Sequence, residues 1–264
     1  MQHATIVYHC AAMVTLGRNE DIVMKTNIIG TKNIVDAALE NRIGKLCFVS
    51  SIAACGKTDK GELIDENSVW RESDKRSEYS KSKYFSEIEI WKGIHQGLNV
   101  VIVNPGVILV VSGTNTGSSK LISQIKKGLK FYTNGGSGYV DVRDVVKIMI
   151  QLTKSDISGE RFIVVSENLS NKDVLSWMAD GLGKQRPFIC IGKSMLWIVG
   201  IISEIIGKLF HFVPLIDRGT AYTVSNRAYY SNKKIKKAIE FQFTPIHKTI
   251  KDICSYFSER RSDI

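Results

Sequence analysis

The chain has 264 residues, of which 44% are hydrophobic and only four are proline, so its composition excludes a disordered or fibrous protein and predicts a globular one. Its formal net charge of +10 has the sign that attracts nucleic acid, anionic lipid or a phosphorylated ligand, but no nucleic-acid-binding module accompanies that charge. The five cysteines are scattered, without a Cys-x-x-Cys pair, which argues against a metal centre and favours free thiols in a reducing compartment. Because the N-terminus also lacks the layout of a signal peptide, we expect a cytoplasmic protein.

Short apolar runs alternate with longer segments of helical period, which predicts βαβ units and a parallel sheet. Strands are expected at 6–10, 46–50, 100–104 and 162–165, and helices at 19–41, 77–97, 116–128, 141–154, 171–182, 194–211 and 245–260. Two successive crossovers predict an α/β fold with a doubly wound parallel sheet, in which ligands bind at the carboxyl ends of the strands. These ends carry His9 to Ala12, Ser50 with Ser51, and Asn104 to Gly106.

The chain is expected to divide into a sheet-forming part at 1–112 and a mainly helical substrate-binding lobe at 113–264. A strand near 160–166 is expected to return to the main sheet. The glycine-rich run from Gly135 to Gly138 is interpreted as a loop.

Two further segments each have a plain interpretation and a functional one. The run from Lys233 to Lys237 spaces Ile235 and Ile239 toward a core, so its lysines are interpreted as a solvated helix face. The apolar stretch from Met195 to Val213 is nearly long enough to span a bilayer, but Glu204, Lys208 and His211 interrupt it. It is therefore predicted to be a helix of the substrate lobe, with contact at a membrane surface as the alternative.

Tyr79 and Lys83 are the candidate catalytic pair, because a spacing of four places both side chains on one helix face. A tyrosine hydroxyl ordinarily has a pKa near 10 and is a poor acid or base at pH 7. A nearby ammonium favours the phenolate, so we expect Lys83 to lower the pKa of Tyr79. Ser51 ends an apolar strand 28 positions earlier, where its hydroxyl can bind the reacting oxygen or simply cap the strand.

Together with these residues, several segments resemble an extended short-chain dehydrogenase/reductase of the NAD-dependent epimerase/dehydratase superfamily. They are Val7 to Ala12, Asn27 to Ala38, Phe48 to Gly56, Asn104 to Val107 and Tyr139 to Val145. The resemblance implies a Rossmann-like fold and an NAD(P)-dependent oxidoreductase that transfers hydride between nicotinamide and a carbonyl or secondary alcohol. It also implies that Ser51, Tyr79 and Lys83 are catalytic.

The resemblance further assigns cofactor contacts to Ala11, Ala12, Ser50, Tyr79, Lys83, Pro105, Gly106 and Val107. It favours the dihydroflavonol-reductase-like and 3β-hydroxysteroid-dehydrogenase-like members, because Ile52 and Ala53 follow Ser51 where dehydratases carry Asp and Glu. Those subfamilies slightly favour NADP over NAD. Family members also pair through two helices, which here correspond to 19–41 and 77–97, so a homodimer acting on a small carbonyl or alcohol is expected.

The sequence lacks a glycine-rich turn between a first strand and a helix, the element that holds a dinucleotide pyrophosphate. The resemblance starts at the family's fourth strand, so we expect the opening half of the fold, about 60–75 residues, to be absent. An internal start, a broken gene and a short protein with another purpose all remain as explanations. A nucleotide-sugar epimerase of the same superfamily and a non-catalytic binding or scaffold module remain as alternative functions.

Overall fold

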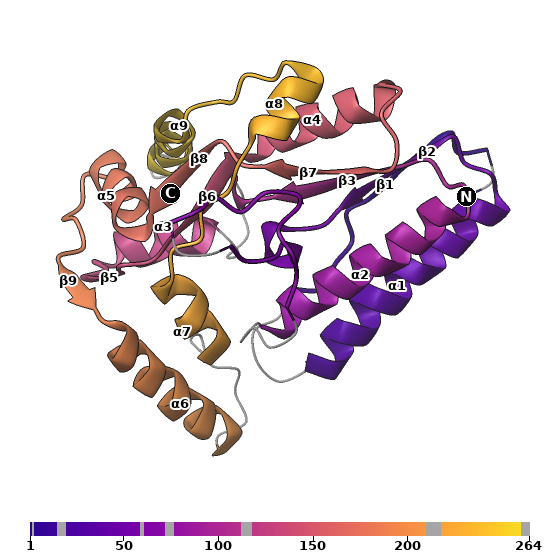
Figure 1. Cartoon of the computed structure of the whole chain (residues 1–264). Coiled ribbons are helices and arrows are strands. Elements are labelled where there is room, and N and C mark those ends of the chain that lie inside the picture. Colours follow the sequence, from indigo (N-terminus) through magenta and orange to yellow (C-terminus); the bar gives the residue numbers. More distant parts are fainter. Residues whose placement is uncertain are drawn as a thin grey trace.

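A four-stranded parallel sheet forms the centre of the computed structural model, which describes residues 1, 3–14, 20–58, 61–71, 77–111, 118–209 and 218–259 (Figure 1). Its strands are β1 (Ile6–His9), β2 (Lys45–Val49), β3 (Val100–Pro105) and β7 (Glu160–Val164), and they lie in that order. Each lies within one residue or two of a predicted strand. The predicted α/β class with a parallel sheet is confirmed.

Helices cover both faces of this sheet (Figure 1). On one face lie α1 (Glu20–Glu40) and α2 (Glu78–His95), and on the other lie α4 (Val142–Lys154) and α8 (Lys233–Ile239). Because successive strand residues point to opposite faces, Val100 and Ile102 pack toward α1 and α2, whereas Val101 and Val103 pack toward α4. The run from Lys233 to Lys237 forms α8, whose Ile235 is fully buried.

The helices α1 and α2 lie side by side because their facing residues are small or matched in shape. A Cβ atom added to Gly93 of α2 would lie 2.7 Å from Cγ1 of Val35 in α1, so only glycine permits this approach. The buried stripe of α1 follows helical spacing and consists of Val23, Asn27, Thr31, Val35 and Ala38. Two of these five are polar, which indicates hydrogen bonding within the interface.

The remaining elements form a second layer beyond the sheet. A three-stranded sheet contains β4 (Val107–Leu109), β6 (Gly136–Asp141) and β8 (Glu167–Ser170), and a two-stranded ribbon contains β5 (Phe131–Thr133) and β9 (Ile189–Ile191). Around them lie α3 (Ser118–Lys126), α5 (Asn171–Gly181), α6 (Lys193–Leu209), α7 (Arg218–Ser225) and α9 (Ile246–Glu259). A short 3-10 helix, η1, covers Ile52–Ala54.

The interpretation of Gly135 to Gly138 as a loop was wrong, because Gly136 to Gly138 belong to the buried strand β6. The turn between β3 and β4 passes directly over this strand. A Cβ atom on Gly106 would lie 2.4 Å from the carbonyl oxygen of Gly138, so the glycines serve close backbone approach.

The segment from Tyr139 to Val145 ties the C-terminal helix to the sheet. Asp141 caps α4 and is 1% exposed, and its carboxylate accepts hydrogen bonds from Arg143 and from the Thr249 hydroxyl of α9. Asp144 accepts two hydrogen bonds from Thr244. Burial alone would raise the pKa of Asp141, but the hydrogen bonds from Arg143 and Thr249 lower it below its ordinary value, so its carboxylate stays charged and holds α9 in place.

Candidate active site

Ser51 and Tyr79 meet at the carboxyl end of β2, where the sequence predicted a site. Ser51 follows β2, and its hydroxyl accepts a hydrogen bond of 3.1 Å from the backbone of Ala53, so it caps η1. Ser51 also acts on Tyr79 in the first turn of α2, where it opposes the rise that burial causes in the Tyr79 pKa. Ser51 is therefore a cap, of η1 rather than of the strand, and its binding of a reacting oxygen stays a prediction.

The first turn of α2 is fixed to η1 by a second contact. Ser77 caps the helix by accepting a hydrogen bond from the backbone of Ser80, and the Ser80 hydroxyl donates to the Ala53 carbonyl. Tyr79 stands between these two anchors in the chain. Its position relative to Ser51 is thus set by backbone contacts on both sides.

Lys83 lies one turn after Tyr79, where it is 3% exposed. Its ammonium donates a hydrogen bond of 2.9 Å to the Val49 carbonyl at the end of β2 and lies 5.3 Å from the centre of the Phe48 ring. Burial lowers the pKa of Lys83 from 10.5 to about 8, although Glu87 and Cys10 favour its charged form. Lys83 is therefore a buried cation that releases its proton far more readily than an exposed lysine.

The pKa of Tyr79 is not lowered, contrary to what its spacing to Lys83 predicted. Burial raises the pKa of Tyr79 above its ordinary value of 10.0, and the group that acts in the opposite direction is Ser51. Spacing on a helix placed the lysine correctly, but it could not reveal that the Lys83 ammonium turns toward the Val49 carbonyl. In this state Tyr79 retains its proton at neutral pH.

Asn27 supports the site, although it was not among the predicted site residues. It begins the segment from Asn27 to Ala38 that resembles the family. Its side-chain oxygen accepts a hydrogen bond of 2.7 Å from the backbone of Met13, and its nitrogen donates to the Met13 carbonyl and to the Ser82 hydroxyl. Ser82 in turn donates to the Tyr79 carbonyl. Asn27 therefore connects the segment after β1 to the catalytic turn of α2.

A second buried network lies behind Lys83 and was also missed. Glu87, one turn further along α2 and 2% exposed, accepts a hydrogen bond of 2.6 Å from Asn104 and forms a 3.3 Å ion pair with Arg161. Asn104 also donates to the Ser51 carbonyl. The spacing of four between Lys83 and Glu87 was the signal that could have revealed it.

His9 belongs to the support of this site rather than to its acid and base groups. Its ring lies 5.2 Å from the Phe48 ring, and Nε2 lies 3.1 Å from the Thr31 hydroxyl. Burial, with a smaller effect of Lys83, lowers the pKa of His9 from 6.5 to about 4. The imidazole is therefore neutral at physiological pH.

The residues assigned to cofactor contact lie at the ends of β1, β2 and β3. Ala11, Ala12 and Val107 are exposed, whereas Pro105 is buried at the end of β3. The Ser50 hydroxyl is buried and finds no hydrogen-bond partner among the residues that the structure describes. An unpaired buried hydroxyl beside an exposed strand edge fits a polar ligand group at this position.

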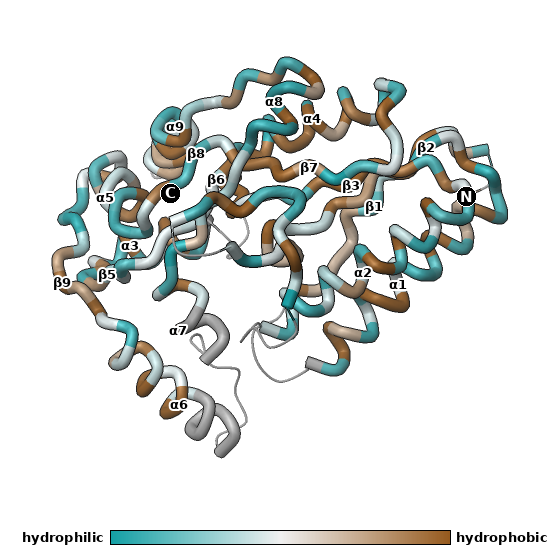
Figure 2. The backbone as a smooth tube through the Cα atoms, in the orientation of Figure 1, coloured by the Kyte–Doolittle hydropathy of each residue, from teal (hydrophilic) through white to brown (hydrophobic). Residues whose placement is uncertain are grey.

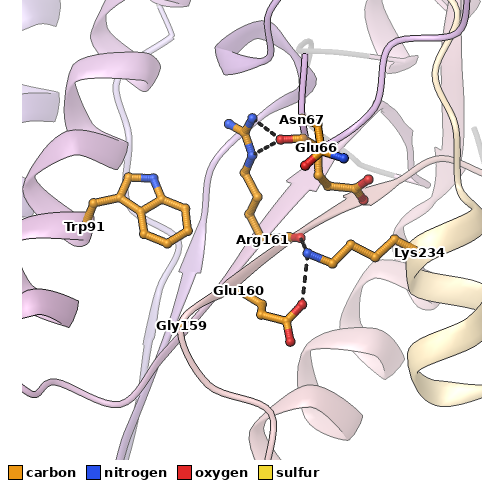
Figure 3. Close-up of a pocket in the computed structure, with 7 residues that line it drawn as sticks. All are labelled: Glu66, Asn67, Trp91, Gly159, Glu160, Arg161 and Lys234. Atoms are coloured by element: carbon orange, nitrogen blue, oxygen red, sulfur yellow. Dashed lines mark hydrogen bonds and ion pairs between the residues drawn. The ribbon is translucent and has the colours of Figure 1, made fainter. Parts of the chain in front are cut away.

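A cleft at the other end of the sheet has different chemistry (Figure 3). It is lined by Glu66, Asn67, Trp91, Gly159, Glu160, Arg161 and Lys234. Lys234 pairs with Glu160 at 2.9 Å, and Arg161 donates to the Glu66 carbonyl. Trp91 lies twelve residues after Tyr79 on α2, about 18 Å along the helix, and Arg161 connects this cleft to the Glu87 network behind Lys83.

The family known as NAD_binding_4, described as male sterility protein, matches residues 1–149. The chain belongs to this family. The match contains Ser51, Tyr79 and Lys83 and all three strands whose carboxyl ends meet there.

Curated relatives and solved structures extend the likeness over nearly the whole chain. A Synechocystis protein with the provisional name dihydroflavonol 4-reductase is 24% identical over 97% of this chain and 77% of its own length. The 3beta-hydroxysteroid-dehydrogenase/decarboxylase isoform 1 of Arabidopsis thaliana is 24% identical over 99% of this chain and 64% of its own length.

Among solved structures, gox2253 is 27% identical with a TM-score of 0.82, over 98% of this chain and 80% of that one. The dTDP-glucose 4,6-dehydratase DesIV of Streptomyces venezuelae, solved with NAD and TYD, has a TM-score of 0.77 at 16% identity, over 99% of this chain and 75% of that one. DesIV shares the fold. The predicted resemblance to extended short-chain dehydrogenases/reductases, with reductase-like relatives, is confirmed. The predicted class of oxidoreductase also agrees with these relatives.

Proposed function

We propose that this chain carries the proton-transfer centre of an NAD(P)-dependent oxidoreductase that interconverts a carbonyl compound and a secondary alcohol. The observation that carries the proposal is that Ser51 and Tyr79 lie on segments joined at the carboxyl end of β2, where Ser80 of α2 bonds to η1, with buried Lys83 one turn away. In a parallel α/β sheet this is the edge at which ligands bind.

In the direction of carbonyl reduction, the protonated Tyr79 is the acid. Its pKa is raised by burial, so the hydroxyl keeps its proton until charge develops on the carbonyl oxygen of the substrate. Ser51 then donates to that oxygen and orients it. The nicotinamide supplies the hydride when it is bound, and the protein determines where the oxygen receives its proton.

Lys83 is proposed to hold the ribose beside the nicotinamide, and Ser50 to use its unpaired hydroxyl for the same ligand. Ala11 and Ala12 are proposed to lie beside the adenosine, and the turn from Pro105 to Val107 beside the nicotinamide amide. A preference for NADP, a cytoplasmic location and a homodimer through α1 and α2 are further parts of this proposal.

The experiment measures oxidation of NADPH and of NADH by the full chain with a panel of small aldehydes and ketones, together with the Kd of each cofactor from nicotinamide fluorescence. Tyr79→Phe is expected to lower kcat about 100-fold or more while Kd changes little, because only the transferred proton is lost. Tyr84→Phe is the matched control, since Tyr84 lies on the same helix with its ring stacked on Trp70 at 4.2 Å.

Equal losses in the two variants, or an unchanged rate in Tyr79→Phe, would contradict the assignment of Tyr79. Absence of binding by both cofactors would instead refute independent catalysis by this chain and favour the binding-module alternative.

A further inference from the structure

The helix α6 exposes large apolar side chains on the surface of the substrate lobe. Met195, Trp197, Ile198 and Ile202 are 62%, 56%, 52% and 49% exposed, and we call these four residues the α6 patch. Figure 2 shows α6 standing apart from the central sheet, with several hydrophobic residues in the coloured part of the helix. The helix is therefore apolar on a face where surface helices are normally polar.

The opposite face of α6 is buried against the rest of the molecule. Leu196 is 2% exposed and Gly200 is buried, and Ala221 of the neighbouring α7 is 2% exposed. Of residues 194–203, none is charged. A helix that is apolar on all sides, with one side exposed, indicates that a further surface covers it.

The charge around the patch indicates what that surface is. The segment from 180 to 208 contains four basic residues, Lys184, Arg186, Lys193 and Lys208, against two acidic residues, Asp180 and Glu204, so its net charge is +2 although Arg186 pairs with Asp180. The same segment exposes Phe188 and Ile189 by 57% and 38% immediately before α6. A second copy of the chain would place this positive segment against itself, whereas an anionic lipid surface complements it.

No helix in the described part of the chain is both long and apolar enough to cross a bilayer. The 17 residues of α6 extend about 25 Å, which suits a helix lying in the plane of the interface. A tryptophan within the exposed face fits the boundary between headgroups and acyl chains, since its ring is amphipathic. We propose that the α6 patch docks this protein on the surface of an anionic lipid bilayer.

The test is sedimentation of the full chain with vesicles of phosphatidylcholine and phosphatidylglycerol at three to one, and with vesicles of phosphatidylcholine alone. Wild type is expected to bind the anionic vesicles and to bind the neutral ones several-fold less. The double variant Ile198→Glu with Ile202→Glu is expected to bind the anionic vesicles roughly tenfold or more weakly, because it places two charges in the helix face that would enter the lipid. The control is Val146→Glu with Ile150→Glu on α4, where the side chains are 48% and 41% exposed.

A second readout measures the wild-type protein and so does not depend on the stability of the glutamate variants. Lipids brominated on their acyl chains are expected to quench Trp197, and most of this quenching should disappear in Trp197→Phe. Equal binding to neutral vesicles, equal losses in both double variants, or quenching that survives Trp197→Phe would overturn the proposal. So would light scattering that shows a dimer dissociated by the α6 variant, since the patch would then bind a second copy.

Discussion

Replacing Lys83 with methionine tests how much free energy the buried ammonium costs. Burial lowers the pKa of Lys83 from 10.5 to about 8, and each pKa unit corresponds to 1.36 kcal/mol, so the charged lysine destabilises the fold by about 3 kcal/mol below pH 8. Lys83→Met removes this cost but also removes the hydrogen bond to the Val49 carbonyl, a loss of about 1 kcal/mol. The variant should therefore be more stable than wild type by about 2 kcal/mol at pH 7.

The sign of the pH dependence follows from the protons bound in each state. Between about pH 8 and pH 10.5 the folded protein binds fewer protons at Lys83 than the unfolded chain, so wild-type stability rises with pH through this window. The advantage of Lys83→Met should shrink by about 2 kcal/mol between pH 7 and pH 10. The measurement is the free energy of unfolding from urea titrations at pH 7, 8, 9 and 10.

The control is Lys81→Met on the same helix. Lys81 pairs with Glu78 at the surface, and we expect its replacement to change stability by less than about 1 kcal/mol. If the difference between Lys83→Met and wild type stays constant from pH 7 to pH 10, the assignment of a strongly depressed lysine pKa is wrong.

Further substitutions test the packing around the site by thermal and urea unfolding. Asn27→Ala removes three hydrogen bonds made by a side chain that is 4% exposed and should cost about 2–3 kcal/mol, and a cost near zero would show that the segment after β1 is held by other contacts. Glu87→Gln leaves Arg161 without its carboxylate and should cost about 2–4 kcal/mol, and a double-mutant cycle with Arg161→Met should return a coupling of at least about 1 kcal/mol. Gly106→Ala should cost more than about 1 kcal/mol because its Cβ meets a β6 carbonyl at 2.4 Å, whereas Gly30→Ala, with open space around it in α1, should stabilise by about 0.5–1 kcal/mol.

The central strands β2 and β3 were predictable because they are buried on both faces and read as nearly continuous apolar runs. Val100 to Val103 needed no tertiary information to be assigned, and the order of crossovers then determined which strand ends meet. The strand β6 was not predictable in this way, since Gly136, Ser137 and Gly138 are turn-forming residues by composition. Their place in a strand depends on the close passage of Gly106, which is distant in sequence.

The site likewise contains residues that local spacing predicts and partners that depend on tertiary packing. Tyr79, Lys83 and Ser51 could be proposed from local spacing and strand ends, and the structure places them together. The partners that set their chemistry could not be proposed, because the Val49 carbonyl and the Asn104 amide reach the site through tertiary packing. For the same reason, helix spacing alone predicted a lowered pKa for Tyr79, whereas burial raises it.

Burial favours the neutral form of both Tyr79 and Lys83 in the free protein. Tyr79 holds its proton because burial disfavours the phenolate, and Lys83 holds its proton less firmly because burial disfavours the ammonium. A ligand that brings negative charge or hydrogen-bond acceptors near Lys83 would favour its charged form, which in turn would favour the Tyr79 phenolate. Cofactor binding is therefore expected to raise the pKa of Lys83 and to lower the pKa of Tyr79. The tyrosine would then become an effective acid only in the loaded enzyme. A pH profile of kcat whose acidic group titrates below the Tyr79 pKa of the free protein would fit this coupling, and identical values in the two states would contradict it.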